Sequence, residues 1–170
     1  MNRECCPKIV FLDLDGTVWS SLDISAQKPP FRKVSENKIV DFEGLPIELN
    51  YGVKEFLIWA RRNGLKVCSL SWNIPEIAIE ALKAFEIFEM FDGHFIEYHP
   101  YKGMLMKKVL NNLGLDVKPC QIVYVDDRDI HLKNVREEVG DVVFIQMGVN
   151  VKHFLELKSV LKNLLRDKCV

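Results

Sequence analysis

The chain has 170 residues, of which 48% are hydrophobic and 28% charged, and its formal net charge is -1. This length suits one domain with a substantial core. Balanced acidic and basic residues argue against a surface for nucleic acid or an anionic membrane. No apolar run approaches the roughly 20 residues of a membrane span, and the first residues do not resemble a signal peptide. We therefore expect a cytoplasmic protein, a monomer or weak dimer, without nucleic-acid or membrane partners.

The five cysteines are Cys5, Cys6, Cys68, Cys120 and Cys169. Their odd number and the lack of a Cys-x-x-Cys pair fit neither a disulfide framework nor a zinc site. We therefore expect reduced thiols, with Cys68 and Cys120 near strands. A redox role for the adjacent Cys5 and Cys6 is the alternative.

The predicted elements alternate between strands and helices along the chain. Apolar runs predict strands at residues 8–13, 65–70, 95–97, 121–125 and 142–145, and helical patterns cover 53–63, 75–85, 101–113, 129–139 and 151–166, the last capped by Asn150. This alternation predicts parallel β-α-β units. The expected fold is a three-layer, Rossmann-like α/β fold with helices on both faces of a parallel sheet.

One stretch, at about residues 18–50, interrupts this alternation. Its first half has no helical period, and two short runs at 38–42 and 45–49 predict a hairpin. Pro46 favours an edge position for the second strand, because proline cannot donate a ladder hydrogen bond. The stretch is too short and too polar for a second domain. We therefore predict a single domain over residues 1–170, with a small flap and no large cap.

Polar side chains follow three of the predicted strands, where the apolar residues end. They are Asp13, Asp15 and Thr17 after the first strand, Ser71 and Asn73 after the second, and Asp126 and Asp127 after the fourth, while Lys102 begins a helix. The carboxyl ends of parallel strands share one edge of the sheet, where ligands bind. Carboxylates suit Mg²⁺, which prefers oxygen ligands. Hydroxyl and ammonium donors suit a phosphate, so the sequence predicts a site for both.

Two choices concern the acidic residues. Asp13 and Asp15 alone could merely cap the turn at Gly16, since aspartate is common in turns. A second acidic pair at another strand end favours a functional site. Asp129 rivals Asp127 as the last acidic residue, because it could instead be an N-cap; we prefer Asp127.

Two further choices concern the serine and the lysine. Ser69 rivals Ser71, because strand alternation places both on one face of the sheet. We prefer Ser71, which lies nearer the strand end. Lys107 and Lys108 rival Lys102, but they fit a solvated helix face better.

These residues resemble the four ordered motifs of the haloacid dehalogenase-like (HAD) superfamily phosphatases. The motifs are Asp13-Leu14-Asp15-Gly16-Thr17, Ser71 after its strand, Lys102, and Asp126-Asp127, which together cover residues 8 to about 147. The sequence most resembles the magnesium-dependent phosphatase branch. That resemblance includes Asp-x-Asp-x-Thr-x-Trp ending at Trp19, Pro29-Pro30-Phe31, the hairpin before the Tyr51 helix, and Gly148-Val149-Asn150.

The resemblance implies phosphomonoester hydrolysis with Mg²⁺ as cofactor, on a phosphorylated small molecule or a phosphoprotein. Asp13 would be the nucleophile that forms an aspartyl-phosphate, and Asp15 the general acid and base. The implied metal ligands are Asp13, Asp15 and Asp126; the phosphate-binding residues are Leu14, Asp15, Ser71, Trp72 and Lys102; and Thr17, Asn73 and Asp127 would support them.

The chain departs from this branch at two positions. Gly16 stands where the branch has a bulky aromatic residue, and Trp72 where it has an arginine, which binds oxyanions in a bidentate way. The hydrolytic residues are intact, so the departures concern the substrate, either a phosphoprotein such as one bearing phosphotyrosine or a sugar phosphate. The alternatives are a non-catalytic phosphate- or partner-binding domain and another HAD-type transferase or hydrolase.

Overall fold

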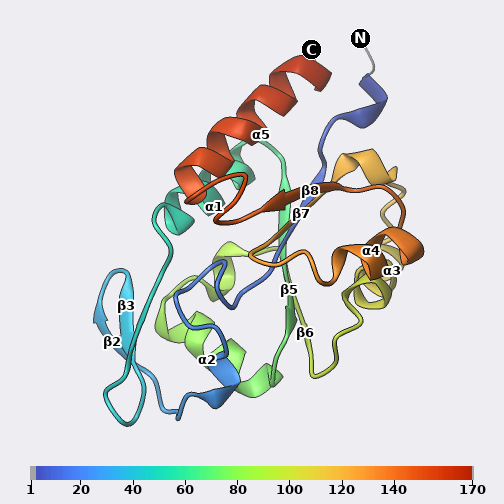
Figure 1. Cartoon of the computed structure of the whole chain (residues 1–170). Coiled ribbons are helices and arrows are strands. Elements are labelled where there is room, and N and C mark those ends of the chain that lie inside the picture. Colours follow the sequence, from blue (N-terminus) through green and yellow to red (C-terminus); the bar gives the residue numbers. More distant parts are fainter. Residues whose placement is uncertain (1–2, 170) are drawn as a thin grey trace.

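The computed structural model describes residues 3–169 (Figure 1). Its centre is a five-stranded sheet in the order β6-β5-β1-β7-β8, in which every neighbouring pair is parallel. The strands are β1 (Ile9–Leu12), β5 (Lys66–Trp72), β6 (Gly93–Glu97), β7 (Ile122–Asp126) and β8 (Val143–Gln146). All four residues of β1 are buried, as expected for the central strand of a parallel sheet covered on both faces.

Helices cover both faces of this sheet. Successive side chains of β1 point to opposite faces, so Val10 and Leu12 join one core cluster and Ile9 and Phe11 the other. The first cluster includes side chains of α1 (Val53–Arg62), α2 (Pro75–Ala84) and α5 (Phe154–Cys169), and the second those of α3 (Lys102–Asn112) and α4 (Leu132–Glu138). The predicted three-layer α/β fold is confirmed.

The predicted boundaries lie close to the observed ones except around α4 and α5. Helix α4 begins at Leu132 rather than at residue 129, and α5 begins at Phe154 and extends to Cys169. The prediction of Asn150 as an N-cap was wrong. Its side-chain Oδ1 accepts a hydrogen bond from Gln146 N at 2.8 Å, so it closes the turn after β8 instead.

A small antiparallel sheet occupies the stretch predicted as a flap. It has the order β2-β3-β4, with β2 (Arg32–Ser35), β3 (Lys38–Val40) and β4 (Pro46–Glu48). The predicted hairpin is confirmed as β3 and β4, with Pro46 on an edge strand, but β2 lies where the sequence indicated irregular chain. Its sheet contributes Ile39 and Ile47 to the core cluster of α1 and α2. Residues 3–169 contain no larger cap.

The expectation of reduced cysteines was wrong for four of the five. Disulfides join Cys5 to Cys120 and Cys6 to Cys169, while Cys68 is buried and free. The paired residues lie 115 and 163 positions apart in the sequence, so no local spacing pattern reveals them. Both bonds lie where the N-terminal segment meets other parts of the fold.

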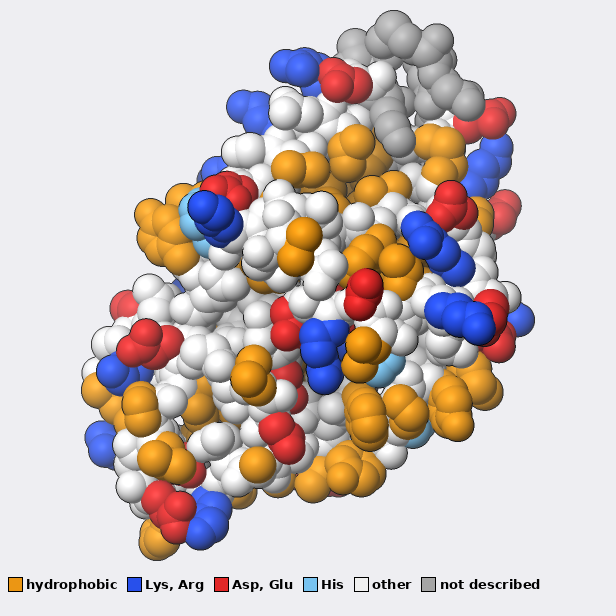
Figure 2. All heavy atoms as spheres, viewed as in Figure 1, with side chains coloured by type: hydrophobic (Ala, Val, Ile, Leu, Met, Phe, Trp, Pro, Cys, Tyr) orange, Lys and Arg blue, Asp and Glu red, His pale blue; other side chains and the backbone are white. Residues whose placement is uncertain are grey.

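No helix within residues 3–169 combines the length and the apolar character needed to cross a membrane. In Figure 2, acidic and basic side chains lie next to one another near the middle of the visible face, with hydrophobic side chains around them.

Candidate active site

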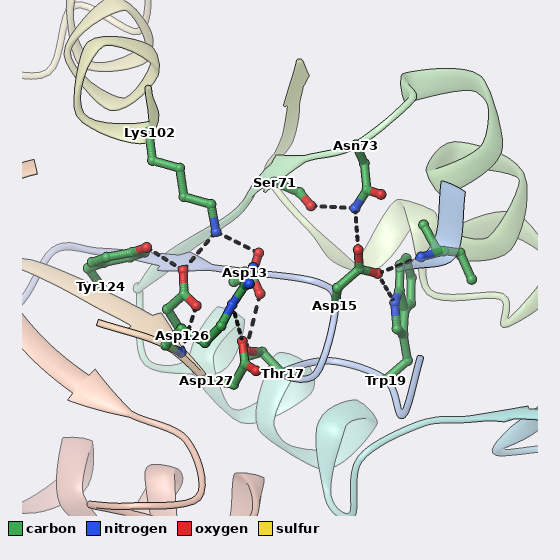
Figure 3. A network of polar contacts seen from close by, with 12 residues as sticks. Asp13, Asp15, Thr17, Trp19, Ser71, Asn73, Lys102, Tyr124, Asp126 and Asp127 are labelled. Carbon is green, nitrogen blue, oxygen red and sulfur yellow. Dashed lines mark hydrogen bonds and ion pairs between the residues drawn. The ribbon is translucent and has the colours of Figure 1, made fainter. Parts of the chain in front are cut away.

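A buried lysine joins two aspartates from separate strand ends (Figure 3). Asp13 follows β1, Asp126 ends β7, and Lys102 is the first residue of α3. The Lys102 Nζ donates to Asp13 Oδ1 and to Asp126 Oδ2, at 2.7 Å in each case. The three side chains are at most 5% exposed. Asp13 and Asp126 lie 113 positions apart in the sequence. They meet here because parallel strands end at one edge of the sheet.

Burial and charge act in opposite directions on these groups. Burial raises the pKa of Asp13 to about 7, although the charge of Lys102 opposes that rise. Burial also acts to raise the pKa of Asp126, but the charge and hydrogen bond of Lys102 outweigh it and lower the pKa overall. The pKa of Lys102 is raised, because the two carboxylates outweigh its burial. The site therefore keeps a lysine cation beside an aspartate that accepts a proton readily.

Three carboxylates form a group that could hold a metal ion. Oxygen atoms of Asp13, Asp126 and Asp127 all lie within 4.8 Å of one another. Asp127 Oδ1 is buried without a hydrogen-bond partner among residues 3–169, which is uncommon because buried polar atoms are normally paired. An all-oxygen donor set with a free buried oxygen fits Mg²⁺. Asp129 is exposed and does not belong to this group.

Gly16 allows the first and last acidic motifs to approach each other. Its φ is +66°, a conformation that residues with a side chain rarely adopt, and a Cβ there would lie 2.6 Å from Asp127 Oδ2. An aromatic side chain has no room at this position while Asp127 keeps its place. The first departure from the magnesium-dependent branch therefore lies directly against the last acidic motif.

Asp15 lies on the other side of Asp13, in a separate hydrogen-bond network (Figure 3). Its Oδ1 accepts from Trp19 Nε1 at 2.7 Å and from Ile24 N at 3.1 Å, and its Oδ2 accepts from Asn73 Nδ2 at 3.0 Å. Burial raises the pKa of Asp15, and the hydrogen bonds from Trp19, Asn73 and Ile24 reduce the rise. Two neighbouring carboxylates are thus held by different partners.

Ser71 and Asn73 extend this network to the end of β5. Asn73 Nδ2 also donates to Ser71 Oγ at 2.7 Å, and Asn73 Oδ1 accepts from Ser25 Oγ at 2.8 Å. Ser69, the rival of Ser71, is instead hydrogen-bonded to His94 Nδ1 at 2.9 Å, away from Asp15. The structure therefore places Ser71 rather than Ser69 beside the acidic residues.

The remaining predicted residues surround these two networks. Thr17 Oγ1 donates to Asp13 Oδ2 at 3.4 Å, and the carbonyl of Leu14, whose side chain is buried, accepts from Val18 N at 2.8 Å. The rivals of Lys102 lie on the surface. Lys107 and Lys108 form exposed ion pairs with Glu138 and Glu97.

A cavity of about 210 Å³ opens beside Asp15. Its lining consists of Asp15, Leu22, Asp23, Ser25, Trp72, Tyr98 and Arg128. Trp72 lines this cavity with a 42% exposed indole. A larger hollow of about 480 Å³ along α4 contains none of the predicted site residues. Most of the lining residues lie in loops, where no periodic pattern marks them in the sequence.

Tyr124 is a site residue that the sequence analysis missed. It is fully buried in β7, and its hydroxyl donates a short hydrogen bond to Asp126 Oδ2. Strand alternation was the available signal, because residues two apart share one face of a strand. Tyr124 therefore reaches the carboxylate two positions further along the chain.

The fold is that of the HAD-superfamily hydrolases. A HAD-superfamily hydrolase from Ehrlichia chaffeensis superposes with a TM-score of 0.63 at 12% identity, over 97% of this chain and 99% of that one. The N-terminal part of a Bacteroides fragilis protein, which contains a phosphatase domain and is complexed with Mg, gives a TM-score of 0.59 at 18% identity. That alignment covers 94% of this chain and only 40% of the other. At these identities the comparisons show the fold.

Residues 5–163 match the family model described as Acid Phosphatase, and the chain belongs to this family. It is also 26% identical over 149 residues to the human protein named "Magnesium-dependent phosphatase 1", covering 86% of this chain and 82% of that protein. The resemblance to HAD-type phosphatases is thereby confirmed.

Proposed function

We propose that this protein hydrolyses phosphomonoesters with Mg²⁺ as its cofactor, through an aspartyl-phosphate formed on Asp13. One observation carries the proposal: a buried lysine and two further carboxylates surround Asp13, while Asp15 lies beside it in a different environment. This arrangement separates a nucleophile from an acid. The human relative's name supports both the reaction and the metal.

The carboxylates of Asp13 and Asp126 and the backbone carbonyl of Asp15 would hold the Mg²⁺, with Asp127 supporting it. When bound, the ion would offset the negative charge of the carboxylates and the phosphoryl group. Lys102, which donates to both Asp13 and Asp126, supplies a further positive charge. Ser71, Lys102 and the chain around Leu14 and Trp72 would bind the phosphoryl oxygens.

Asp13 would attack phosphorus, so that an Asp13–phosphorus bond forms as the bond to the leaving oxygen breaks. Asp15 would give its proton to that oxygen. It would then accept a proton from the water that attacks the aspartyl-phosphate, releasing inorganic phosphate and restoring Asp13. The raised pKa of Asp15 favours the proton-carrying form. Hydrogen bonds from Trp19 and Asn73 keep its carboxyl group oriented.

The test compares turnover of p-nitrophenyl phosphate in Mg²⁺ and in excess chelator. Asp13→Asn should lower the rate by a factor on the order of 10³ or more, because removal of a nucleophile abolishes the covalent route. Asp129→Asn, which removes the same charge from an exposed position outside the metal group, should keep the wild-type rate. Acid-quenched wild-type enzyme should carry phosphate on Asp13 by mass spectrometry.

Each alternative makes a different prediction in this experiment. A non-catalytic phosphate- or partner-binding domain would bind phosphate without turnover. A HAD-type transferase would pass the phosphoryl group to an added acceptor faster than to water. Turnover that persists in Asp13→Asn would remove Asp13 from the nucleophile role.

The proposed substrate is a phosphoprotein, such as one bearing phosphotyrosine, or a sugar phosphate. The absence of a large cap within residues 3–169 supports access for large substrates. A screen of phosphotyrosine peptides, sugar phosphates and nucleotides in Mg²⁺ would distinguish these classes by kcat/KM.

A cytoplasmic location is part of the proposal, and the cysteines provide its test. Cytosolic proteins normally keep their thiols reduced, whereas Cys5, Cys6, Cys120 and Cys169 pair in the structure. Counting free thiols in protein taken from its native source decides the matter. Five free thiols fit the cytoplasm, and one fits an oxidising compartment.

A further inference from the structure

The cavity beside Asp15 contains a cation that the proposed chemistry does not use. We propose that Arg128 binds a second negatively charged group on the leaving group of the substrate, while Trp72 and Tyr98 contact a flat ring of that group. The inference rests on the proposed function, because it identifies this cavity as the leaving-group side of the site.

The position of Asp15 identifies the side. Asp15 is proposed to protonate the leaving oxygen, so the leaving group must lie within reach of its carboxyl group. The cavity of about 210 Å³ that Asp15 lines provides that space. The Asp13, Lys102 and Asp126 group is proposed to hold the phosphoryl end.

Arg128 is the one lysine or arginine among the residues that line the cavity. Lys102 is not among the residues that line the cavity, and its Nζ donates to Asp13 and Asp126. The Arg128 side chain is 54% exposed, and its Nε lies 3.9 Å from Asp127 Oδ1, beyond hydrogen-bond distance. A guanidinium has five N–H donors, and a carboxylate or phosphate can accept two of them at once.

The backbone of Arg128 is fixed at the edge of the proposed metal site. Arg128 N donates to Asp126 Oδ1 at 3.0 Å, so the residue is attached directly to the proposed metal ligand. Asp23 also lines the cavity, and its carboxylate would repel a second anion. Arg128 is the lining residue whose charge can offset that repulsion.

The aromatic walls suit a ring. Trp72 and Tyr98 are 42% and 71% exposed, and such side chains bind the faces or edges of planar groups. The Trp72 ring meets the His131 ring edge-on, with centroids 6.3 Å apart and an interplanar angle of 81°, which restricts its orientation. The expected leaving group is therefore a ring with a carboxylate or a second phosphate.

The experiment measures binding of non-hydrolysable phosphonates by calorimetry in Mg²⁺. The two anionic probes are 4-carboxybenzylphosphonate and 1,4-xylylenediphosphonate, and 4-carbamoylbenzylphosphonate is the neutral match of the first. Wild-type protein should bind the carboxylate about tenfold or more tightly than the amide, because a hydrogen bond to a charged group is the stronger one. The diphosphonate shows whether a second phosphate is preferred over a carboxylate.

Arg128→Gln should reduce the carboxylate-to-amide ratio of dissociation constants to about one, and Arg128→Lys should retain part of it. Arg166→Gln is the matched control, because it removes the same charge from a 72% exposed side chain near the end of α5. It should keep the wild-type ratio.

An arginine that only balances Asp127 would change the binding of both probes equally. The inference is therefore wrong if Arg128→Gln keeps the wild-type ratio, or if wild-type protein binds neither phosphonate or does not distinguish them. Turnover of p-nitrophenyl phosphate is measured separately. A correct ratio without any turnover would overturn the proposed hydrolysis and leave the anion subsite supported.

Discussion

Protonation of Asp13 should make both the stability of the protein and its affinity for Mg²⁺ depend on pH. Its pKa is raised by burial from 3.8 to about 7 in the metal-free protein, so the folded state retains a proton that the unfolded state loses. The contribution of Asp13 to the free energy of unfolding of the metal-free protein should therefore fall as pH rises from about 4 to about 7. Mg²⁺ needs the carboxylate form, so its affinity should increase over the same range.

Thermal unfolding with and without Mg²⁺ checks this coupling. The rise in Tm on adding Mg²⁺ should be clearly larger at about pH 8 than at about pH 5.5, since stabilisation by a ligand grows with the logarithm of its concentration divided by its Kd. Asp13→Asn has no carboxyl group to titrate at this position. The Mg²⁺-dependent rise in Tm should therefore differ less between the two pH values than in the wild type. An equal rise at both pH values in the wild type would contradict the assignment.

Tyr124 is expected to position a metal ligand without touching the metal itself. Its hydroxyl and Lys102 Nζ both donate to Asp126 Oδ2, which limits rotation of that carboxylate. Tyr124→Phe removes one donor and keeps the ring packed against Phe144. The Mg²⁺ concentration for half-maximal activity should rise about tenfold.

Tyr51→Phe is the control for this change, because it removes a hydroxyl from a 66% exposed side chain. It should leave the Mg²⁺ requirement as in the wild type. Equal Mg²⁺ requirements in Tyr124→Phe and wild type would show that the hydroxyl has no positioning role.

At the scale of elements, the contact between α3 and α4 holds Lys102 in place. Gly103 follows Lys102, and a Cβ at Gly103 would lie 2.3 Å from the backbone oxygen of Asn134 in α4. Gly103 N also donates to Asn134 Oδ1 at 2.8 Å. The two helices can approach this closely only because residue 103 has no side chain.

Gly103→Ala should therefore push α3 away from α4 and displace the Lys102 ammonium. Overpacking of this kind costs about 1–3 kcal/mol, which chemical denaturation can measure, and kcat should fall as well. Lys107→Ala on the exposed face of α3 should change stability by less than about 0.5 kcal/mol. Wild-type stability and kcat in Gly103→Ala would contradict this account.

Most elements could be predicted from the sequence, because apolar periodicity reports local structure and the side that is buried. The four motif positions were also accessible, since each lies at a predicted strand end or helix start. The start of α5 and strand β2 were not. Asparagine is common at N-caps, but Asn150 closes a turn. Strand β2 is stabilised by its pairing with β3 rather than by an apolar pattern of its own.

At the scale of the whole molecule, two disulfides tie the N-terminal segment to the rest of the fold. Cys5 is joined to the turn before β7, and Cys6 to the last turn of α5. Such cross-links restrict the unfolded chain, and a long loop gains most from them. The bond between Cys6 and Cys169 closes almost the entire chain into one loop.

Cys169→Ser should thus lower the free energy of unfolding by about 2–4 kcal/mol, measured by denaturant titration without reductant. A reductant opens both disulfides, so it should lower the stability of the wild type by more than Cys169→Ser does. It should have no effect on a variant in which all four paired cysteines are serine. Equal stability of wild type and Cys169→Ser would show that this pairing does not stabilise the protein in solution.

The sequence by itself determined the parallel α/β architecture, the position of the acidic edge and the residue types gathered there. These features follow from local periodicity and from the rule that parallel strands end together. Tertiary structure alone decided the cysteine pairs and the lining of the cavity that contains Arg128. Each of those depends on contacts between segments far apart in the chain, and local patterns contain no record of such contacts.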